Sequence, residues 1–147
     1  NFHDLDNFIT TKEGLTINEI FKQKKELYFR KIEREYLKEL INKDEEKVIS
    51  LGGGTPCYDN NMEIILNTFD SDSIYINRSI GFLVNRLYNK IYSRPLIAHL
   101  KSKEELKEFI SKHLFERNQY YLRSKKTLKT DNSELDQVIQ ELMDVLD

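Results

Sequence analysis

Two short groups of residues have types and spacings suited to holding a small polar ligand. Asp4 and Asp6 are carboxylates one residue apart, just after the start of the chain, and Gly52-Gly53-Gly54 directly follows the apolar stretch VISL. Carboxylates accept hydrogen bonds from hydroxyl groups and approach hydrated Mg²⁺. Consecutive glycines allow positive φ or the close approach of another group to the main chain. Both groups therefore predict a ligand site.

Each group also has a simpler structural explanation. An Asp-x-Asp sequence after a strand is often a turn or a helix cap, because a short carboxylate accepts hydrogen bonds from nearby backbone N–H groups. Three glycines can form a loose turn. The functional interpretation depends on whether the strands before these groups end at one edge of a sheet, where ligands collect in α/β proteins.

The hydrophobic pattern predicts strands that alternate with helices. Thr16-Ile-Asn-Glu19 is a capping box that marks a helix start, and apolar residues recur with helical period from Lys24 to Asn42. Such alternation implies an α/β fold with a parallel sheet. We expect strands at 2–4, 47–51, 73–77 and 127–130, and further helices at 60–67, 80–90, 102–119 and 133–146.

Composition limits the kinds of partner. The chain has 147 residues, enough for about one domain, and its 23 basic and 25 acidic side chains nearly cancel. This balance gives no broad basic field for nucleic acid and no polybasic membrane signal. No apolar stretch approaches the ~20 residues of a membrane span. We therefore expect a soluble, cytoplasmic protein with a small-molecule partner.

Six segments, in order along the chain, resemble the shikimate kinase family: FHDLDNFI, EGLTINEIF, ELYFRKIEREYLKEL, VISLGGGTPC, SRPLIA and FERNQYY. The resemblance implies a three-layer α/β/α P-loop kinase with a parallel sheet. It implies one kinase domain over residues 1–147, with a substrate-binding subdomain at about 5–35 and a lid at about 89–102. The implied reaction is ATP-dependent phosphorylation of the shikimate 3-hydroxyl in aromatic amino acid biosynthesis, with ATP and Mg²⁺ as cofactors.

The same resemblance implies roles for residues in the first half of the chain. Asp6 would orient the 3-hydroxyl and help take its proton, and Asp4 would approach Mg²⁺. Gly52, Gly53 and Gly54 would line the substrate site, with backbone N–H groups of the last two facing the shikimate ring. Arg30 would bind the shikimate carboxylate, because its planar fork meets a carboxylate bidentately, and Glu33 would orient that fork.

Three further arginines receive roles from the resemblance. Arg117 would be the second arginine on the shikimate carboxylate. Arg94, in the lid, would place positive charge beside the transferring phosphoryl group and also contact the nucleotide. Arg86 would stack on adenine. Without the family pattern, Arg30 and Arg117 are each explained as a charge on a charged helix, and Arg94 as an ordinary loop arginine.

Two departures from the family stand out. Lys25 replaces a usual glycine, and because lysine is the better helix former we expect it to be harmless within a helix. The phosphate loop Gly-x-x-x-x-Gly-Lys-[Ser/Thr] does not occur in the 147 residues. The sequence therefore predicts that the family's first βα unit, with its central strand, is not in this chain. We expect the chain alone to be inactive as a kinase, and the protein to be a monomer when that unit is present.

Two other functions remain open. A chain that kept the acceptor site and lost the nucleotide site would be a non-catalytic shikimate-binding or interaction protein. A related small-molecule kinase would use another polyol or acid as acceptor. Two arginines flanking a diol-binding aspartate favour a hydroxylated carboxylic acid over other acceptors.

Overall fold

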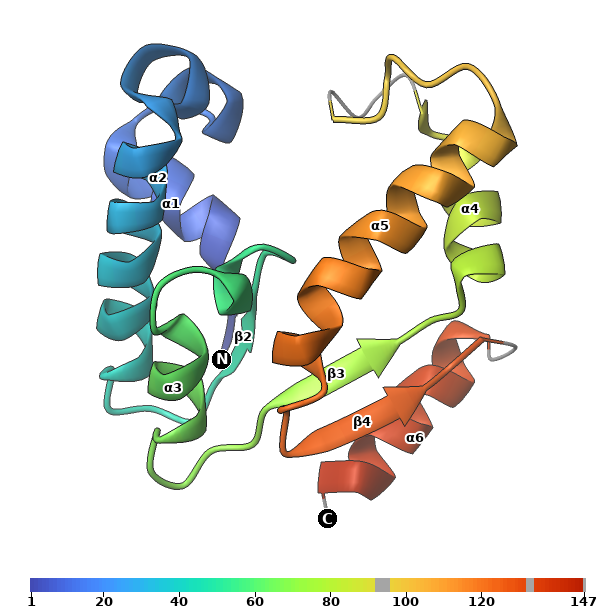
Figure 1. Ribbon diagram of the computed structural model, residues 1–147. Helices are drawn as coiled ribbons and strands as arrows, with labels where there is room; N and C mark the ends of the chain where they lie inside the picture. Colours follow the sequence, from blue (N-terminus) through green and yellow to red (C-terminus); the bar gives the residue numbers. More distant parts are fainter. Residues whose placement is uncertain (92–95, 132–133, 147) are drawn as a thin grey trace. The chain divides into compact units, whose positions relative to one another are not determined.

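Strands and helices alternate along the chain in the computed structural model, which describes residues 1–91, 96–131 and 134–146 (Figure 1). The strands and helices expected from the sequence are present within a few residues of their predicted bounds. Contacts divide the chain into a first unit, Asn1–Ser71, and a second unit, Asp72–Asp147. The order is β1 (Phe2–Asp4), α1 (Leu5–Glu13), α2 (Ile17–Ile41), β2 (Val48–Ser50), a 3₁₀ turn (Thr55–Cys57), α3 (Asn61–Leu66), β3 (Ile74–Asn77), α4 (Ile80–Tyr88), α5 (Lys103–Tyr121), β4 (Lys126–Lys129) and α6 (Leu135–Leu146).

The strands pair in parallel, two in each unit. β1 pairs with β2, with Asp4 opposite Ser50, and β3 pairs with β4, with Asn77 opposite Lys129. Parallel pairing confirms the predicted α/β class. The pairing of the described residues gives two two-stranded sheets. Because β1 and β2 run in the same direction, the residues that follow Asp4 and Ser50 emerge at the same edge.

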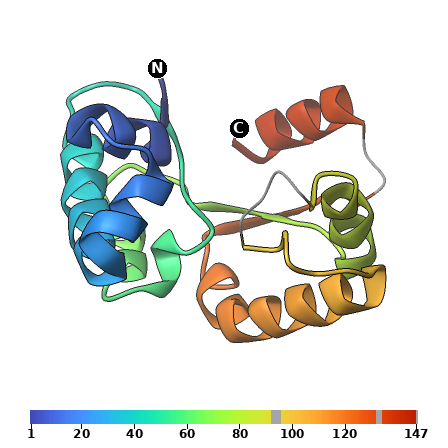
Figure 2. The same ribbon diagram turned by 90° about the horizontal axis from the view of Figure 1, so that it is seen from above.

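The core of the first unit forms where α1 packs against α2, and the two helices lie side by side in Figure 2. α1 begins at the cap Asp4, whose Oδ1 accepts a hydrogen bond from Asn7 N at 2.9 Å. The predicted capping box at the start of α2 is present, since Glu19 Oε2 accepts from Thr16 N at 2.8 Å. The apolar stripe of α2 supplies most of the buried side chains, which with those of α1 are Leu5, Ile9, Ile20, Phe29, Ile32, Leu37 and Leu40.

The second unit has its own core between α4 and α5. Ser79 and Ser102 cap these helices, each accepting a hydrogen bond from the backbone N–H three residues later. The start of the last helix, expected at Ser133, lies outside the described residues. Over the part of the chain that the structure describes, no helix combines the length and apolar character of a membrane span. The buried apolar residues of this core are Val84, Ile91, Ile97, Leu106 and Ile110.

The prediction that Lys25 lies within a helix is wrong. Lys25 has φ 70° and ψ 169° and interrupts α2, which is therefore two helical segments, 17–24 and 26–41. Only glycine adopts this conformation without strain, because a Cβ crowds the neighbouring backbone. Helix propensity does not apply where the chain is not helical.

Glu13, at the end of α1, holds both segments of α2. Its carboxylate accepts hydrogen bonds from Lys24 Nζ at 3.0 Å, Tyr28 OH at 2.8 Å and Tyr36 OH at 2.7 Å. The bonds from Tyr36, Tyr28 and Lys24 hold the pKa of Glu13 below its usual value. The bond to Glu13 raises the pKa of Tyr36 to about 12. Lys24 precedes the break at Lys25 and the two tyrosines follow it. This one carboxylate therefore holds the two helical segments together at their joint, residue 25.

Replacing Lys25 with glycine is expected to raise the free energy of unfolding by about 1 kcal/mol, because the strain of a Cβ at positive φ is removed. Lys22→Gly is the matched control, since Lys22 is an exposed lysine in the helical segment before the break. Glycine there should cost about 1 kcal/mol. Urea denaturation measures both variants, and equal destabilisation by both would contradict strain at residue 25.

The hydrogen bonds that Glu13 accepts are expected to make a contribution to the free energy of unfolding that depends on pH. The folded-state pKa of Glu13 is depressed, so its contribution is full above the ordinary value of 4.5 and is lost as pH falls through the folded-state pKa. The stability advantage of the native protein over Glu13→Gln should therefore shrink as pH is lowered from 7 toward about 3. Denaturant titrations at several pH values measure it. Tyr36→Phe, which removes the strongest donor, should reduce this pH dependence, and an advantage independent of pH would contradict the assignment.

Candidate functional site

Several of the predicted site residues come together in the first unit, at the ends of β1 and β2. Asp6 lies in the first turn of α1, directly after β1, and the glycines follow β2. A Cβ placed on Gly52 would lie 3.5 Å from Asp6 Oδ1 and 3.8 Å from Glu33 Oε1. A Cβ placed on Gly54 would lie 2.9 Å from Arg30 Nη1. Parallel pairing of the two strands thus produces the convergence that the sequence predicted.

The glycines after β2 allow another group to lie close to the main chain. They are not required by a positive φ. Among the described glycines, only Gly14 has a positive φ. At Gly54, a methyl group would lie 2.9 Å from Arg30 Nη1 and 3.0 Å from Nη2, closer than side chains tolerate. The group pressed against this main chain is therefore the protein's own Arg30. Gly53 is exposed between its two neighbours.

The guanidinium of Arg30 is held on several sides. Its Nη1 donates to Glu33 Oε2 at 2.9 Å, while Nε and Nη2 each lie 3.4 Å from Glu26 Oε1. Its Cζ lies 3.7 Å from the ring centre of Tyr58 and 5.1 Å from that of Phe29. Burial disfavours the charge, but Glu33, and after it Tyr58 and Glu26, outweigh burial and raise the pKa of Arg30. The result is a fixed, permanently charged fork.

Glu33 is buried and accepts a hydrogen bond from Arg30, which is the arrangement that its predicted orienting role requires. The residue is 1% exposed, and its other oxygen, Oε1, accepts a hydrogen bond from Thr55 Oγ1 at 2.7 Å. Thr55 is fully buried at the start of the 3₁₀ turn. Thr55 is not identified from the sequence, because a single hydroxyl after three glycines carries no periodic or motif signal. The sequence feature that could point to Thr55 is its position directly after the three glycines.

The two aspartates after β1 play different parts. Asp4 is the N-cap of α1, which confirms the structural explanation given above for one member of the pair. The pKa of Asp6 is raised, first by burial of its carboxyl group and then by the negative charges of Asp4 and Glu33, while Arg30 opposes the shift. A carboxylate with a raised pKa is a better proton acceptor near neutral pH.

The donor chemistry at this edge fits a hydrated Mg²⁺. In the described ranges there is no group of three or more His, Cys, Asp or Glu side chains that could hold a metal by itself. Mg²⁺, however, keeps several waters and takes only one or two carboxylates from a protein. Asp4 and Asp6, which follow one another across one residue at the end of β1, supply carboxylates in that number.

The remaining predicted arginines lie elsewhere in the chain. Arg117 is partly exposed in α5, and Arg86 is exposed in the last turn of α4, both within the second unit. Arg94 lies outside the described residues, as does part of the predicted lid. Their assigned roles stay predictions.

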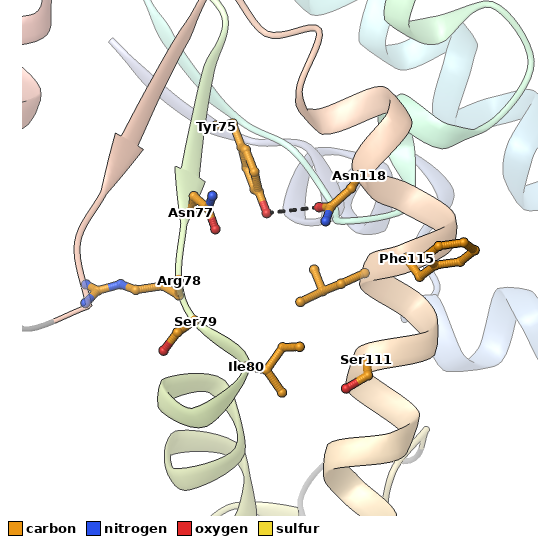
Figure 3. Close-up of a pocket in the computed structure, with 9 residues that line it drawn as sticks. Tyr75, Asn77, Arg78, Ser79, Ile80, Ser111, Phe115 and Asn118 are labelled. Atoms are coloured by element: carbon orange, nitrogen blue, oxygen red, sulfur yellow. Dashed lines mark hydrogen bonds between the residues drawn. The ribbon is translucent and has the colours of Figure 1, made fainter.

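A pocket of about 440 Å³ lies within the second unit, past the end of β3 (Figure 3). Its polar lining includes Asn77, Ser79 and Ser111, and Tyr75 OH donates to Asn118 Oδ1 at 3.3 Å. None of the predicted site residues lines it. The residues directly after β3 were not singled out from the sequence, although strand ends are where ligand contacts are expected.

Comparison with known proteins identifies the family. The model of a family described as shikimate kinase matches residues 1–147. The chain belongs to the shikimate kinase family. A shikimate kinase of Flavobacterium johnsoniae is 46% identical over 145 residues, which cover 99% of this chain and 83% of that protein. A shikimate kinase of Flavobacterium psychrophilum is 41% identical over the same shares of each chain.

Solved shikimate kinase structures share the fold. The crystal structure from Bacteroides thetaiotaomicron matches with a TM-score of 0.86 and 31% identity, over 99% of this chain and 82% of that one. The shikimate kinase from Acinetobacter baumannii, solved in complex with shikimate, matches with a TM-score of 0.83 and 25% identity, over 99% and 78% of the two chains. These matches confirm the P-loop kinase fold and the kinase class that the six sequence segments indicated.

Proposed function

We propose that this protein transfers the γ-phosphoryl group of ATP, with Mg²⁺, to the 3-hydroxyl of shikimate. The proposed setting is aromatic amino acid biosynthesis in the cytoplasm, with the protein acting as a monomer when the phosphate-loop unit is present. The observation that carries the proposal is the convergence of Asp6, Arg30 and Gly54 at one edge of the β1–β2 pair, in a chain that matches the shikimate kinase family over its whole length.

Arg30 is proposed to bind the shikimate carboxylate. Glu33 holds Nη1 at 2.9 Å, whereas Glu26 lies 3.4 Å from both Nε and Nη2. The contact with Glu26 is longer than a usual charge-assisted hydrogen bond. The Nε–Nη2 edge is therefore the one a substrate carboxylate can take over bidentately. Arg117 is proposed as the second arginine on that carboxylate.

Asp6 is proposed as the catalytic carboxylate. It would accept the hydrogen bond of the 3-hydroxyl, orient it for attack and take its proton, a role favoured by its raised pKa. Bound Mg²⁺ would neutralise developing charge on the phosphates, with Asp4 as its protein carboxylate. Arg94 and Arg86 are proposed to contact the nucleotide. The 147 residues contain no Gly-x-x-x-x-Gly-Lys-[Ser/Thr] sequence, so the phosphate loop is assigned to none of them.

The function is tested by measuring ATP-dependent phosphorylation of shikimate by the protein expressed from its complete gene. Transfer to the 3-hydroxyl, followed by phosphorus NMR, is the expected result. Shikimate binding with neither ATP binding nor transfer would support the non-catalytic alternative instead. A panel of hydroxylated acids and polyols would reveal a different acceptor, and a preference for an uncharged polyol would contradict the role of Arg30.

Arg30→Ala is expected to raise the dissociation constant of shikimate about 30-fold or more, because two charge-assisted hydrogen bonds are lost. Nucleotide affinity should be nearly unchanged. Arg34→Ala is the matched control, since Arg34 lies one helical turn later and pairs with Asp59 instead. Titration calorimetry measures all three proteins, and equal losses for shikimate and nucleotide would count against the assignment.

Gly54→Ala is expected to weaken shikimate binding, because a Cβ there would displace the guanidinium of Arg30 from its position 2.9 Å away. Gly81→Ala, in α4, is the control, since a Cβ at that position meets no atom within 4 Å. The control should leave shikimate affinity unchanged and stabilise the helix by about 0.5–1 kcal/mol. Unaltered shikimate affinity in Gly54→Ala would show that the close approach has no functional part.

A further inference from the structure

The buried carboxylate of Glu33 needs partners on both of its oxygens. Among the described residues, Glu33 is the one charged side chain that is buried. Taking a carboxylate out of water is costly unless each oxygen accepts hydrogen bonds. Oε2 accepts from Arg30 Nη1 at 2.9 Å, and Oε1 accepts from Thr55 Oγ1 at 2.7 Å. The two oxygens thus serve two different donors.

The hydrogen bond from Thr55 sets the orientation of the Glu33 carboxylate relative to Arg30. The last torsion of a glutamate side chain is soft, with broad minima rather than sharp rotamers. With a donor fixed on Oε1, the carboxylate plane is set and Oε2 is directed at the guanidinium. Without that donor, the carboxylate can rotate or bind water. The guanidinium of Arg30 is then no longer held in one position.

Thr55 itself is rigidly placed. Its N–H donates to Gly52 O at 3.0 Å, and its carbonyl accepts from Asn61 Nδ2 at 2.9 Å. Thr55 is 0% exposed and Asn61 is 1% exposed. A Cβ on Gly52 would approach Thr55 Oγ1 to 3.2 Å, so this glycine leaves room for the hydroxyl. The glycine loop and α3 therefore hold the donor from both sides.

We propose that Thr55 is a positioning residue for acceptor binding, acting through Glu33 on Arg30. Its hydroxyl fixes the carboxylate of Glu33, which in turn fixes the guanidinium that meets the shikimate carboxylate. The ligand in this statement rests on the function proposed above. The chain of contacts is Thr55 Oγ1 to Glu33 Oε1 at 2.7 Å and Glu33 Oε2 to Arg30 Nη1 at 2.9 Å.

The test compares Thr55→Val, which keeps the volume and removes the donor, with Thr55→Ser, which keeps the donor. In titration calorimetry on the complete protein, Thr55→Val should raise the shikimate dissociation constant about tenfold, which is the lower end of the loss that follows removal of a residue orienting a metal ligand. Thr55→Ser should stay near the native value, and nucleotide affinity should not change in either. If Thr55→Val does not fold, Thr55→Cys, with its weak S–H donor, replaces it.

Thr130→Val is the matched control. Thr130 is also 0% exposed, but its Oγ1 has no hydrogen-bond partner among the described residues. Removing this hydroxyl should leave shikimate affinity unchanged. A loss of affinity equal to that of Thr55→Val would show a general effect of altered packing and would overturn the proposal.

A double-mutant cycle separates action through Glu33 from a direct effect. In a Glu33→Gln background, Thr55→Val should add little to the loss already present, whereas independent effects would add. Additive losses, or a Thr55→Val affinity equal to the native one while Arg30→Ala abolishes binding, would overturn this inference alone. Failure of the native protein to bind shikimate would overturn the proposed function and this inference with it.

Discussion

The ion pair between Arg30 and Glu33 is the interaction on which the acceptor site depends. It places a cation beside a glycine main chain and keeps a buried carboxylate satisfied. A buried carboxylate with one partner missing would be a large destabilisation, so the pair links the position of the fork to the integrity of the fold. Two segments far apart in the sequence meet at this pair: α2, and the continuous stretch from the glycine loop to the turn at Thr55.

The electrostatics of the site are unfavourable to the fold in one respect. Burial raises the pKa of Asp6, and the negative charges of Asp4 and Glu33, brought close to it, raise that pKa further. Arg30 offsets only part of this repulsion. A site that holds an excess of carboxylates at a strand end is arranged to receive cations and hydroxyl donors, and strain of this kind is common where function competes with stability.

The sequence predicted features that follow from local chemistry or from a general rule of α/β topology. The capping box at Thr16 and the strand near 47–51 follow from residue chemistry and periodicity. The meeting of Asp6 with the glycines follows from the parallel pairing that alternating strands and helices imply. The break at Lys25 could not be read in this way, because its backbone angles arise in a tertiary setting, where Glu13 bonds both sides of the joint, while helix propensity is a local preference. Thr55 was missed because its partner, Glu33, lies 22 residues away. Arg117 and Arg86 were assigned by motif alone, and no physical signal around them tests that assignment.

The break in α2 also bears on how substitutions at different positions depend on one another. Lysine at residue 25 leaves a strained backbone between the two helical segments, which other contacts must stabilise. The bonds that converge on Glu13 from Lys24, Tyr28 and Tyr36 supply such contacts here. The tolerance of a side chain at the break is therefore coupled to a carboxylate that belongs to a different helix.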